Sequence, residues 1–257
     1  MKIELDHIYN MDCLEGMKHI PDQSIDAIIC DLPYGVLNKG NKHTQWDSVI
    51  PFDKLWEQYL RITKPTTPII LFAQGMFTAD LMHSNRKMWR YNLVWDKGRV
   101  GGFLNSNRMP LRQHEDITIF YKKLPVYNPQ MMPCAPHARN HGRGSMNKVV
   151  NRCYGNFTPT PAVIADEKFP TSILPFNKEH DSEQFHPTQK PVDLLRYLVL
   201  TYTNSGGVVL DNCFGSGSTI VACIKEHRHY IGFELNKEYF NKAEKRIDRA
   251  RAQLTLF

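Results

Sequence analysis

An acid, a proline and an aromatic residue stand together in Asp31-Leu32-Pro33-Tyr34-Gly35, directly after a short apolar run. The Tyr34 ring can stack on a flat group, and the Asp31 carboxylate and the Leu32 carbonyl can accept hydrogen bonds from an amine. Pro33 fixes its own φ and so holds the carbonyl and the ring in register. The segment therefore suits a flat ring that carries an amino group, although Pro-Tyr-Gly is also ordinary turn material.

A glycine-rich segment, residues 211–219, reads D-N-C-F-G-S-G-S-T and stands between an expected strand and an expected helix. Its glycines permit a tight turn and the close approach of a ligand, and the helix N-terminus offers free N–H groups. The segment is neither a Walker loop nor G-x-G-x-x-G. The next expected strand ends at Glu234, where an acid can bind two ribose hydroxyls. By itself Glu234 is more typical of a solvated acid, but after a glycine loop it favours a nucleoside cofactor that needs no pyrophosphate.

Apolar runs alternate with helical patterns along most of the chain. The expected strands are 8–10, 27–30, 68–73, 91–95, 115–121, 208–210 and 230–233, and the expected helices are 14–20, 51–62, 76–88, 192–202, 219–225 and 237–252. This alternation predicts an α/β fold with a mainly parallel sheet and helices on both faces. Ligands bind beyond the carboxyl ends of such strands, so we expect the Asp31 segment and the glycine segment to converge.

Between the two ordered parts the periodicity is lost. We therefore expect three regions: a catalytic half over 1–121, an irregular insertion over 122–185 that is no part of the sheet, and a cofactor-binding half over 186–257. Basic residues gather in the insertion, and between Pro136 and Arg152 there is no acid. This clustering indicates contact with nucleic acid, although a solvated polar loop is the plainer alternative. The residues expected to contact nucleic acid are Arg139, Arg143, Lys148 and Arg152, together with Arg99 and Arg108 from a second basic stretch over 97–112.

The composition is that of a globular protein, with 42% hydrophobic residues among 257 and a formal net charge of +6. No apolar run reaches the ~18 residues of a membrane span, and no signal peptide opens the chain. Six scattered cysteines without C-x-x-C favour a reducing, cytoplasmic compartment. Cys134, His137, His141 and Cys153 fall within one stretch, but their spacing fits no familiar structural zinc site, so no metal is expected.

Three motifs together resemble those of amino-group DNA methyltransferases. The segment D-L-P-Y resembles their D-P-P-Y signature, and F-G-S-G at 214–217 resembles their F-x-G-x-G loop for S-adenosylmethionine. H-P-T-Q-K-P at 186–191 resembles the segment that precedes that loop. The motif order resembles the β class, and the resemblance covers the chain except residues 122–184. It implies a Rossmann-like, S-adenosylmethionine-dependent methyltransferase fold with circularly permuted motifs.

The resemblance also implies roles for single residues. Asp31, Leu32, Pro33 and Tyr34 are expected to be catalytic, with Asp31 between the cofactor and the target amine. Lys190 resembles the cation that meets the methionine carboxylate, although a lone lysine is more often a surface residue. The residues expected to bind the cofactor are Asp12, Cys13, Asp31, His186, Lys190, Asp211, Phe214, Gly215, Gly217, Thr219 and Glu234.

The implied reaction is methyl transfer from S-adenosylmethionine to N6 of an adenine flipped out of DNA. Asp at the first motif position resembles the adenine-N6 enzymes more than the cytosine-N4 enzymes, where Ser is usual. Leu32 replaces the first proline of the signature, which loosens the loop but keeps the carbonyl. Cys30 is not expected to act as a nucleophile, because on a strand it points away from the Asp31 side.

Other readings stay open at this point. They are cytosine-N4 methylation, adenine methylation in RNA, a non-catalytic module that binds S-adenosylmethionine or DNA, and, more distantly, a nicotinamide-dependent oxidoreductase. The sequence also leaves open a homodimer, a restriction endonuclease partner, and a bacterial or a phage origin.

Overall fold

A computed structural model describes residues 1–37, 46–133, 166–178 and 185–254 of the chain. It contains two compact units, one formed by residues 1–128 with 172–257 and the other by residues 129–171. The smaller unit contains a two-stranded sheet of β6 (Met132–Pro133) and β7 (Glu167–Lys168). All the elements described below belong to the larger unit.

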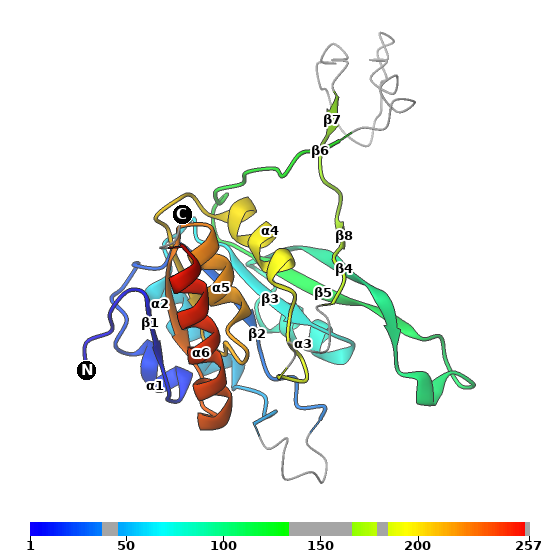
Figure 1. Cartoon of the computed structure of the whole chain (residues 1–257), viewed down its shortest axis with the longest axis horizontal. Helices are drawn as coiled ribbons and strands as arrows, with labels where there is room; N and C mark the ends of the chain where they lie inside the picture. Colours follow the sequence, from blue (N-terminus) through cyan, green and yellow to red (C-terminus); the bar gives the residue numbers. More distant parts are fainter. Residues whose placement is uncertain (38–45, 134–165, 179–184, 255–257) are drawn as a thin grey trace. The chain divides into compact units, whose positions relative to one another are not determined.

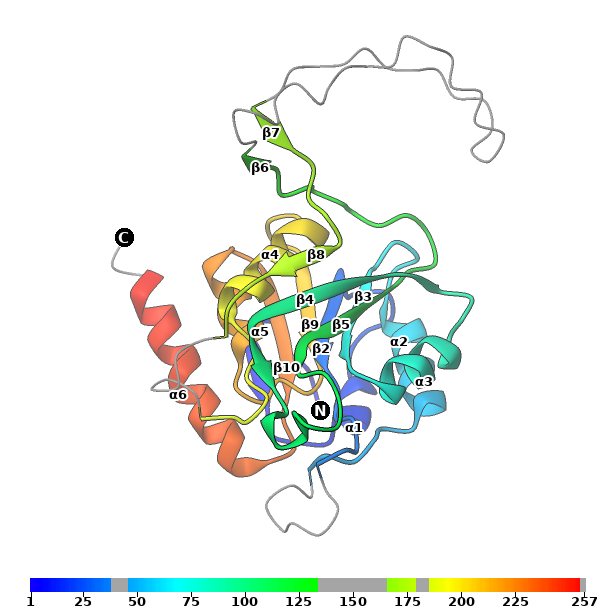
Figure 2. The ribbon, with the colours of Figure 1, turned by 90° about the vertical axis from the view of Figure 1, so that its right-hand side faces the viewer.

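The main sheet has the strand order β1-β10-β9-β2-β3-β5-β4-β8 (Figure 2). Its strands are β1 (His7–Tyr9), β2 (Ala27–Asp31), β3 (Ile69–Ala73), β4 (Trp89–Gly101), β5 (Arg112–Phe120), β8 (Ile173–Pro175), β9 (Val208–Asp211) and β10 (His229–Phe233). Among these strands β5 alone runs antiparallel to its neighbours. The expected mainly parallel α/β sheet is therefore confirmed.

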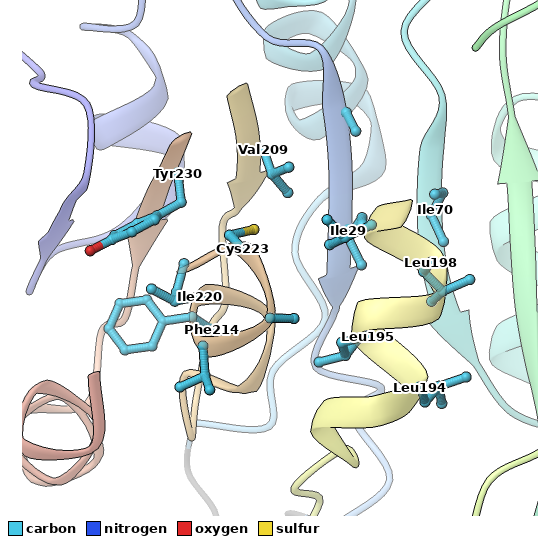
Figure 3. Close-up of a cluster of buried hydrophobic side chains, with 14 of the residues drawn as sticks. Ile29, Ile70, Leu194, Leu195, Leu198, Val209, Phe214, Ile220, Cys223 and Tyr230 are labelled. Atoms are coloured by element: carbon cyan, nitrogen blue, oxygen red, sulfur yellow. The ribbon is translucent and has the colours of Figure 1, made fainter. Parts of the chain in front are cut away.

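Helices cover both faces of this sheet, as expected. They are α1 (Cys13–Met17), α2 (Phe52–Ile62), α3 (Met76–Ser84), α4 (Val192–Tyr202), α5 (Ser218–Lys225) and α6 (Lys237–Leu254). Because side chains alternate along a strand, Ile29 and Ile28 enter different cores. Ile29 packs in the core formed with α4, α5 and α6, whereas Ile28 packs in the core formed with α1, α2 and α3. Figure 1 shows α5 and α6 in front of the sheet, and Figure 3 shows Leu195 and Leu198 of α4 beside Ile29 and Ile70.

The two strands that carry the chemically suggestive segments are neighbours. Ile28 of β2 lies opposite Leu210 of β9 in a parallel pair. Asp31 ends the first strand and Asp211 ends the second. Since parallel strands end at the same edge of a sheet, both segments open into one crevice.

Some sequence-based expectations differ from the structure. The expectation that residues 122–185 add nothing to the sheet is wrong, because β8 pairs in parallel with β4 and Leu174 is buried opposite Trp95. A strand of three residues is too short to show periodicity. Helix α1 ends at Met17, where a turn places the Ile20 amide 3.0 Å from the Met17 carbonyl. Helix α3 ends at Ser84 because Asn85 leaves the helical conformation, with φ of −147°.

Candidate active site

A cavity of about 470 Å³ lies where β2 and β9 end. It is lined by segments far apart in the sequence, including residues 11–14, 31–34, 46–51, 186–190 and 211–216. Of the residues expected to be catalytic or to bind the cofactor, all line this cavity except Gly217. The structure thus brings the Asp31 segment, the glycine loop and the H-P-T-Q-K-P segment to one place.

Both carboxylate oxygens of Asp31 have protein partners. The Tyr34 hydroxyl donates a 2.7 Å hydrogen bond to Oδ1, and the Lys190 ammonium lies 2.5 Å from Oδ2. Burial raises the pKa of the Asp31 carboxyl, and the positive charge of Lys190 opposes that rise. Each carboxylate oxygen can accept about two hydrogen bonds, so Asp31 keeps acceptor capacity toward the cavity.

Lys190 is buried between two acids. Besides Asp31, its ammonium lies 3.4 Å from Oε2 of Glu115 on β5. Burial lowers the pKa of Lys190, but Asp31 and Glu115 outweigh that effect and raise it overall. The role implied for Lys190, toward the carboxylate of a cofactor, stays a prediction, because the structure pairs its ammonium with these two protein carboxylates.

The loop after the Asp31 segment is held by Asp47. Its Oδ1 accepts a 2.9 Å hydrogen bond from the Gly35 amide, and its Oδ2 accepts a 2.6 Å bond from the Leu37 amide. Asp47 is itself buried. The Tyr34 ring also lines the cavity, with its centroid 4.8 Å from that of Phe77. Strand β2 therefore holds the Asp31 segment at its start, and Asp47 holds the backbone that follows it.

The two loop glycines have different functions. Gly215 has φ of +50°, and its amide donates to Oε2 of Glu234 at 2.9 Å. Gly217 has φ of +75° and stands at the N-cap of α5, where a Cβ would meet Ile247 of α6 at 3.2 Å. Gly217 therefore serves helix packing and lies outside the cavity wall.

His186 is a neutral imidazole packed under the glycine loop. A Cβ on Gly215 would lie 3.2 Å from its Nε2, and the Tyr239 and Trp46 rings lie 4.3 Å and 5.2 Å away between centroids. Burial, reinforced by the charge of Lys190, lowers the pKa of His186 to about 4. His186 thus shapes the cavity without adding charge.

Two further acids line the cavity at strand ends. Asp12 caps α1, with Oδ1 accepting from the Leu14 and Glu15 amides at 2.9 Å and 3.1 Å. Asp211 is fully buried, and burial raises its pKa to about 7 although a hydrogen bond with Thr219 opposes the rise. Asp211 therefore titrates close to neutral pH.

Sequence reasoning missed several residues of the cavity wall, namely Trp46, Asp47, Phe72, Gln74, Trp95 and Glu115. They come from a loop and from three strands whose pairing no local pattern reveals. For Glu115 the sequence offered one signal, namely that two acids, Glu115 and Asp116, stand in an otherwise apolar strand.

The residues expected to contact nucleic acid lie away from the cavity or outside the described part of the chain. Arg99 and Arg108 are exposed on the β4–β5 hairpin, which Figure 1 shows projecting from the sheet. Arg139, Arg143, Lys148 and Arg152 lie outside the described residues, as do the four cysteine and histidine residues weighed as a zinc site. Within the described ranges no group of three or more His, Cys, Asp or Glu side chains is arranged to hold a metal ion. No helix in those ranges combines the length and the hydropathy that a membrane span requires.

Comparisons with known proteins agree with this arrangement. A family model for N6/N4 DNA methylases matches residues 25–245. The type II methyltransferase M.BglII of Bacillus subtilis is 25% identical over 94% of this chain and 69% of its own length. M.HpaI of Haemophilus parainfluenzae is 26% identical over 92% and 72%.

Solved structures share the fold. M1.HpyAVI, crystallised as a SAM complex, superposes with a TM-score of 0.61 at 22% identity, covering 93% of this chain and 98% of that one. The cytosine-N4-specific PvuII DNA methyltransferase superposes with a TM-score of 0.67 at 14% identity, covering 98% and 93%. Because the family model matches most of the chain, from before the Asp31 segment to beyond the glycine loop, the chain belongs to the N6/N4 family of DNA methylases.

Proposed function

We propose that this protein transfers the methyl group of S-adenosylmethionine to the N6 amine of an adenine flipped out of DNA. The observation that carries the proposal is Asp31, a partly buried carboxylate paired with the buried Lys190. It faces a cavity that the glycine loop also lines. A base inside a duplex is out of reach of such a recessed group, so the base must be extruded.

The cavity suits the cofactor in size and in chemistry. A volume of about 470 Å³ lies within the usual range of small-molecule sites. Glu234 offers a carboxylate at the end of β10 for ribose hydroxyls, while Phe214 and Cys13 offer apolar surface for a purine ring. S-adenosylmethionine supplies a methyl group activated by a sulfonium.

The catalytic segment acts by holding and polarising the target amine. The Asp31 carboxylate and the Leu32 carbonyl accept its two hydrogens, and Tyr34 stacks on the ring. As the nitrogen–carbon bond forms, the carbon–sulfur bond of the sulfonium would break and leave a neutral thioether, so positive charge would pass to the amine nitrogen. The Asp31 carboxylate would stabilise that charge until one amine proton is lost to solvent. Alignment of two reacting groups can contribute roughly 7–11 kcal/mol.

The choice of adenine depends on Asp31 itself. An acid at this motif position resembles the adenine-N6 enzymes, whereas the cytosine-N4 enzymes usually carry Ser there. The fold does not discriminate between them, since PvuII DNA methyltransferase, which is named as cytosine-N4-specific, shares it. Cytosine N4 is therefore the rival acceptor.

Base analysis tests the proposal. Unmethylated plasmid DNA is incubated with the purified protein and S-adenosylmethionine, digested to nucleosides and analysed by mass spectrometry. We expect N6-methyldeoxyadenosine, and its loss with the Asp31→Asn variant while calorimetric affinity for S-adenosylmethionine stays within about threefold. N4-methyldeoxycytidine would overturn the adenine assignment, and methylation by Asp31→Asn at the wild-type rate would overturn the role of Asp31.

Recognition of the DNA sequence is assigned to the compact unit of residues 129–171, within the region expected to be an insertion. The basic residues Arg139, Arg143, Lys148 and Arg152 belong to it and would contact phosphates or base edges. Arg99 and Arg108 on the hairpin would add phosphate contacts.

A further inference from the structure

Four charged side chains from four separate segments form an alternating chain that ends at Asp31. Lys97 of β4 lies 2.7 Å from Oε1 of Glu115 on β5. Oε2 of Glu115 lies 3.4 Å from the Lys190 ammonium, which lies 2.5 Å from Oδ2 of Asp31. The order is positive, negative, positive, negative, so the net charge of the group is zero.

This row of charges is largely shielded from solvent, with Lys190 buried and the other three side chains partly buried. Its side chains are between 7% and 21% exposed. The Lys190 ammonium lies 5.1 Å from the centroid of the Phe72 ring and 6.0 Å from that of Trp95. Removing one partner of such a buried pair leaves an uncompensated charge, which is strongly unfavourable. Each member therefore constrains the position and ionisation of the next.

We propose that Glu115 is a positioning residue for the methyl transfer: it holds Lys190 in place beside Asp31 and so keeps the Asp31 carboxylate aimed at the target amine. The proposal rests on the proposed role of Asp31. Glu115 reaches Asp31 only through Lys190 and contacts neither the amine nor the methyl group in this scheme.

The donor capacity of Lys190 supports this assignment over a role at the cofactor. An ammonium group has three N–H donors. Three protein acceptors surround it, namely Asp31 at 2.5 Å, the Thr188 carbonyl at 3.3 Å and Glu115 at 3.4 Å. Two protein carboxylates already face this one ammonium group, so the carboxylate of a bound ligand would bring a third negative charge to it.

The two inner members of this row of charges, Lys190 and Glu115, act on the pKa of Asp31 with opposite sign. The groups that face Asp31 are Lys190, Glu115 and Tyr34, and the buried Asp211 lies near enough to interact with it. The positive charge of Lys190 lowers the pKa of Asp31, whereas the negative charge of Glu115 raises it. Methyl transfer needs ionised Asp31, so the rate falls as the pH drops through that pKa.

Single-turnover methylation of unmethylated plasmid DNA with tritiated S-adenosylmethionine, measured from pH 5 to pH 9, tests the proposal. The acid limb of the resulting pH–rate profile is the range in which the rate falls as the pH drops. In Lys190→Met we expect this acid limb to move to higher pH by at least one unit. In Glu115→Gln we expect it to move to lower pH, with a plateau rate about tenfold lower because Lys190 is no longer held in place. Lys190→Arg keeps the charge and should restore the wild-type limb.

Calorimetric titration with S-adenosylmethionine separates the two roles of Lys190. We expect Lys190→Met and Glu115→Gln to bind S-adenosylmethionine with an affinity within threefold of wild type. Binding weakened tenfold or more in Lys190→Met, with an unmoved acid limb, would place Lys190 at the cofactor and overturn the proposal. If the acid limbs of Lys190→Met and Glu115→Gln move in the same direction, Glu115 only supports the local structure, and its proposed positioning role is wrong.

Two controls complete the design. Glu238→Gln, an exposed acid of α6, should leave the limb, the rate and the binding unchanged. If Lys190→Met fails to fold, Glu115→Gln compared with Glu115→Asp still decides, since only the latter keeps the charge and should keep the wild-type limb. If Asp31→Asn methylates at the wild-type rate, the proposed role of Asp31 has failed, and this inference fails with it. If Asp31→Asn is inactive while the acid limbs of the Lys190 and Glu115 variants stay at the wild-type pH, this inference alone has failed.

Discussion

The backbone N–H of Gly215 donates a 2.9 Å hydrogen bond to Oε2 of Glu234, which ties the glycine loop to the end of the neighbouring strand β10. Oε1 of the same carboxylate accepts a 2.7 Å bond from the Asn236 amide. Burial raises the pKa of Glu234, and these backbone N–H groups oppose the rise. The carboxylate is therefore oriented toward the cavity before any ligand arrives.

Replacing Glu234 with Gln should weaken binding of S-adenosylmethionine about tenfold, equivalent to ~1.4 kcal/mol, because an amide cannot accept through both terminal atoms. Isothermal titration calorimetry measures the change. Glu238→Gln on the exposed side of α6 is the matched control and should bind normally. Unchanged affinity in Glu234→Gln would mean that Glu234 only holds the loop.

Gly217→Ala should destabilise the protein more than Gly206→Ala. Both glycines have nearly the same positive φ, +75° and +74°, so both variants incur a similar backbone penalty of roughly 1–2 kcal/mol. A Cβ at 217 would also meet Ile247 at 3.2 Å, whereas a Cβ at 206 has nothing within 4 Å. Urea unfolding measures the difference in the free energy of unfolding between the two variants. Equal losses of stability would show that α6 shifts to accommodate the added methyl group at no cost.

Asp47→Ala should lower the free energy of unfolding by roughly 2–3 kcal/mol, because two backbone N–H groups lose a charged acceptor. Asp47→Asn, which keeps one carbonyl acceptor, should lose about half as much. The exposed Asp80 of α3 supplies the control, and Asp80→Ala should change stability by less than about 0.5 kcal/mol. Urea unfolding measures all three, and a neutral Asp47→Ala would contradict the restraint assigned to this residue.

His186 should make the protein less stable in mild acid. Its pKa is about 4 when folded against an ordinary 6.5, so the unfolded chain binds more protons between these values. Stability is therefore full above pH 6.5 and falls as the pH drops toward 4. Between pH 7.5 and pH 5.0 this loss amounts to about 2 kcal/mol. Urea unfolding at both pH values should show that His186→Gln lacks this loss while His83→Gln, at an exposed position, retains it.

Charge reversal at the hairpin should weaken DNA binding. We expect Arg99→Glu with Arg108→Glu to lose at least about tenfold in affinity at low salt and to flatten the salt dependence by one or two phosphate equivalents. Fluorescence anisotropy across a salt series measures both quantities. Arg249→Glu on α6 is the control, because it changes the net charge by the same amount as each hairpin substitution. It should reduce the affinity for DNA far less. Equal effects at the three positions would indicate only a general charge effect.

Local patterns predicted the parts of the fold that depend on local physics. The apolar run before Asp31 forms β2, and helix α4 spans Val192–Tyr202 as expected, because its periodicity is long and unbroken. The place of β5 between β3 and β4 was not predictable, since an apolar strand does not specify its partner. Glu115 and Asp47 were missed for the same reason: each owes its importance to a partner that folding brings near.

The larger unit secures both ends of the chain that leaves it for residues 129–171. Asn128 is held against the end of α4, with its amide 2.7 Å from the Thr201 carbonyl, and on return the Ser172 carbonyl accepts from Val94 at 2.8 Å. These anchors depend on nothing between them. A segment of different length and sequence could therefore be accommodated between Asn128 and Ser172 without changing the hydrogen bonds that hold these two residues in the larger unit.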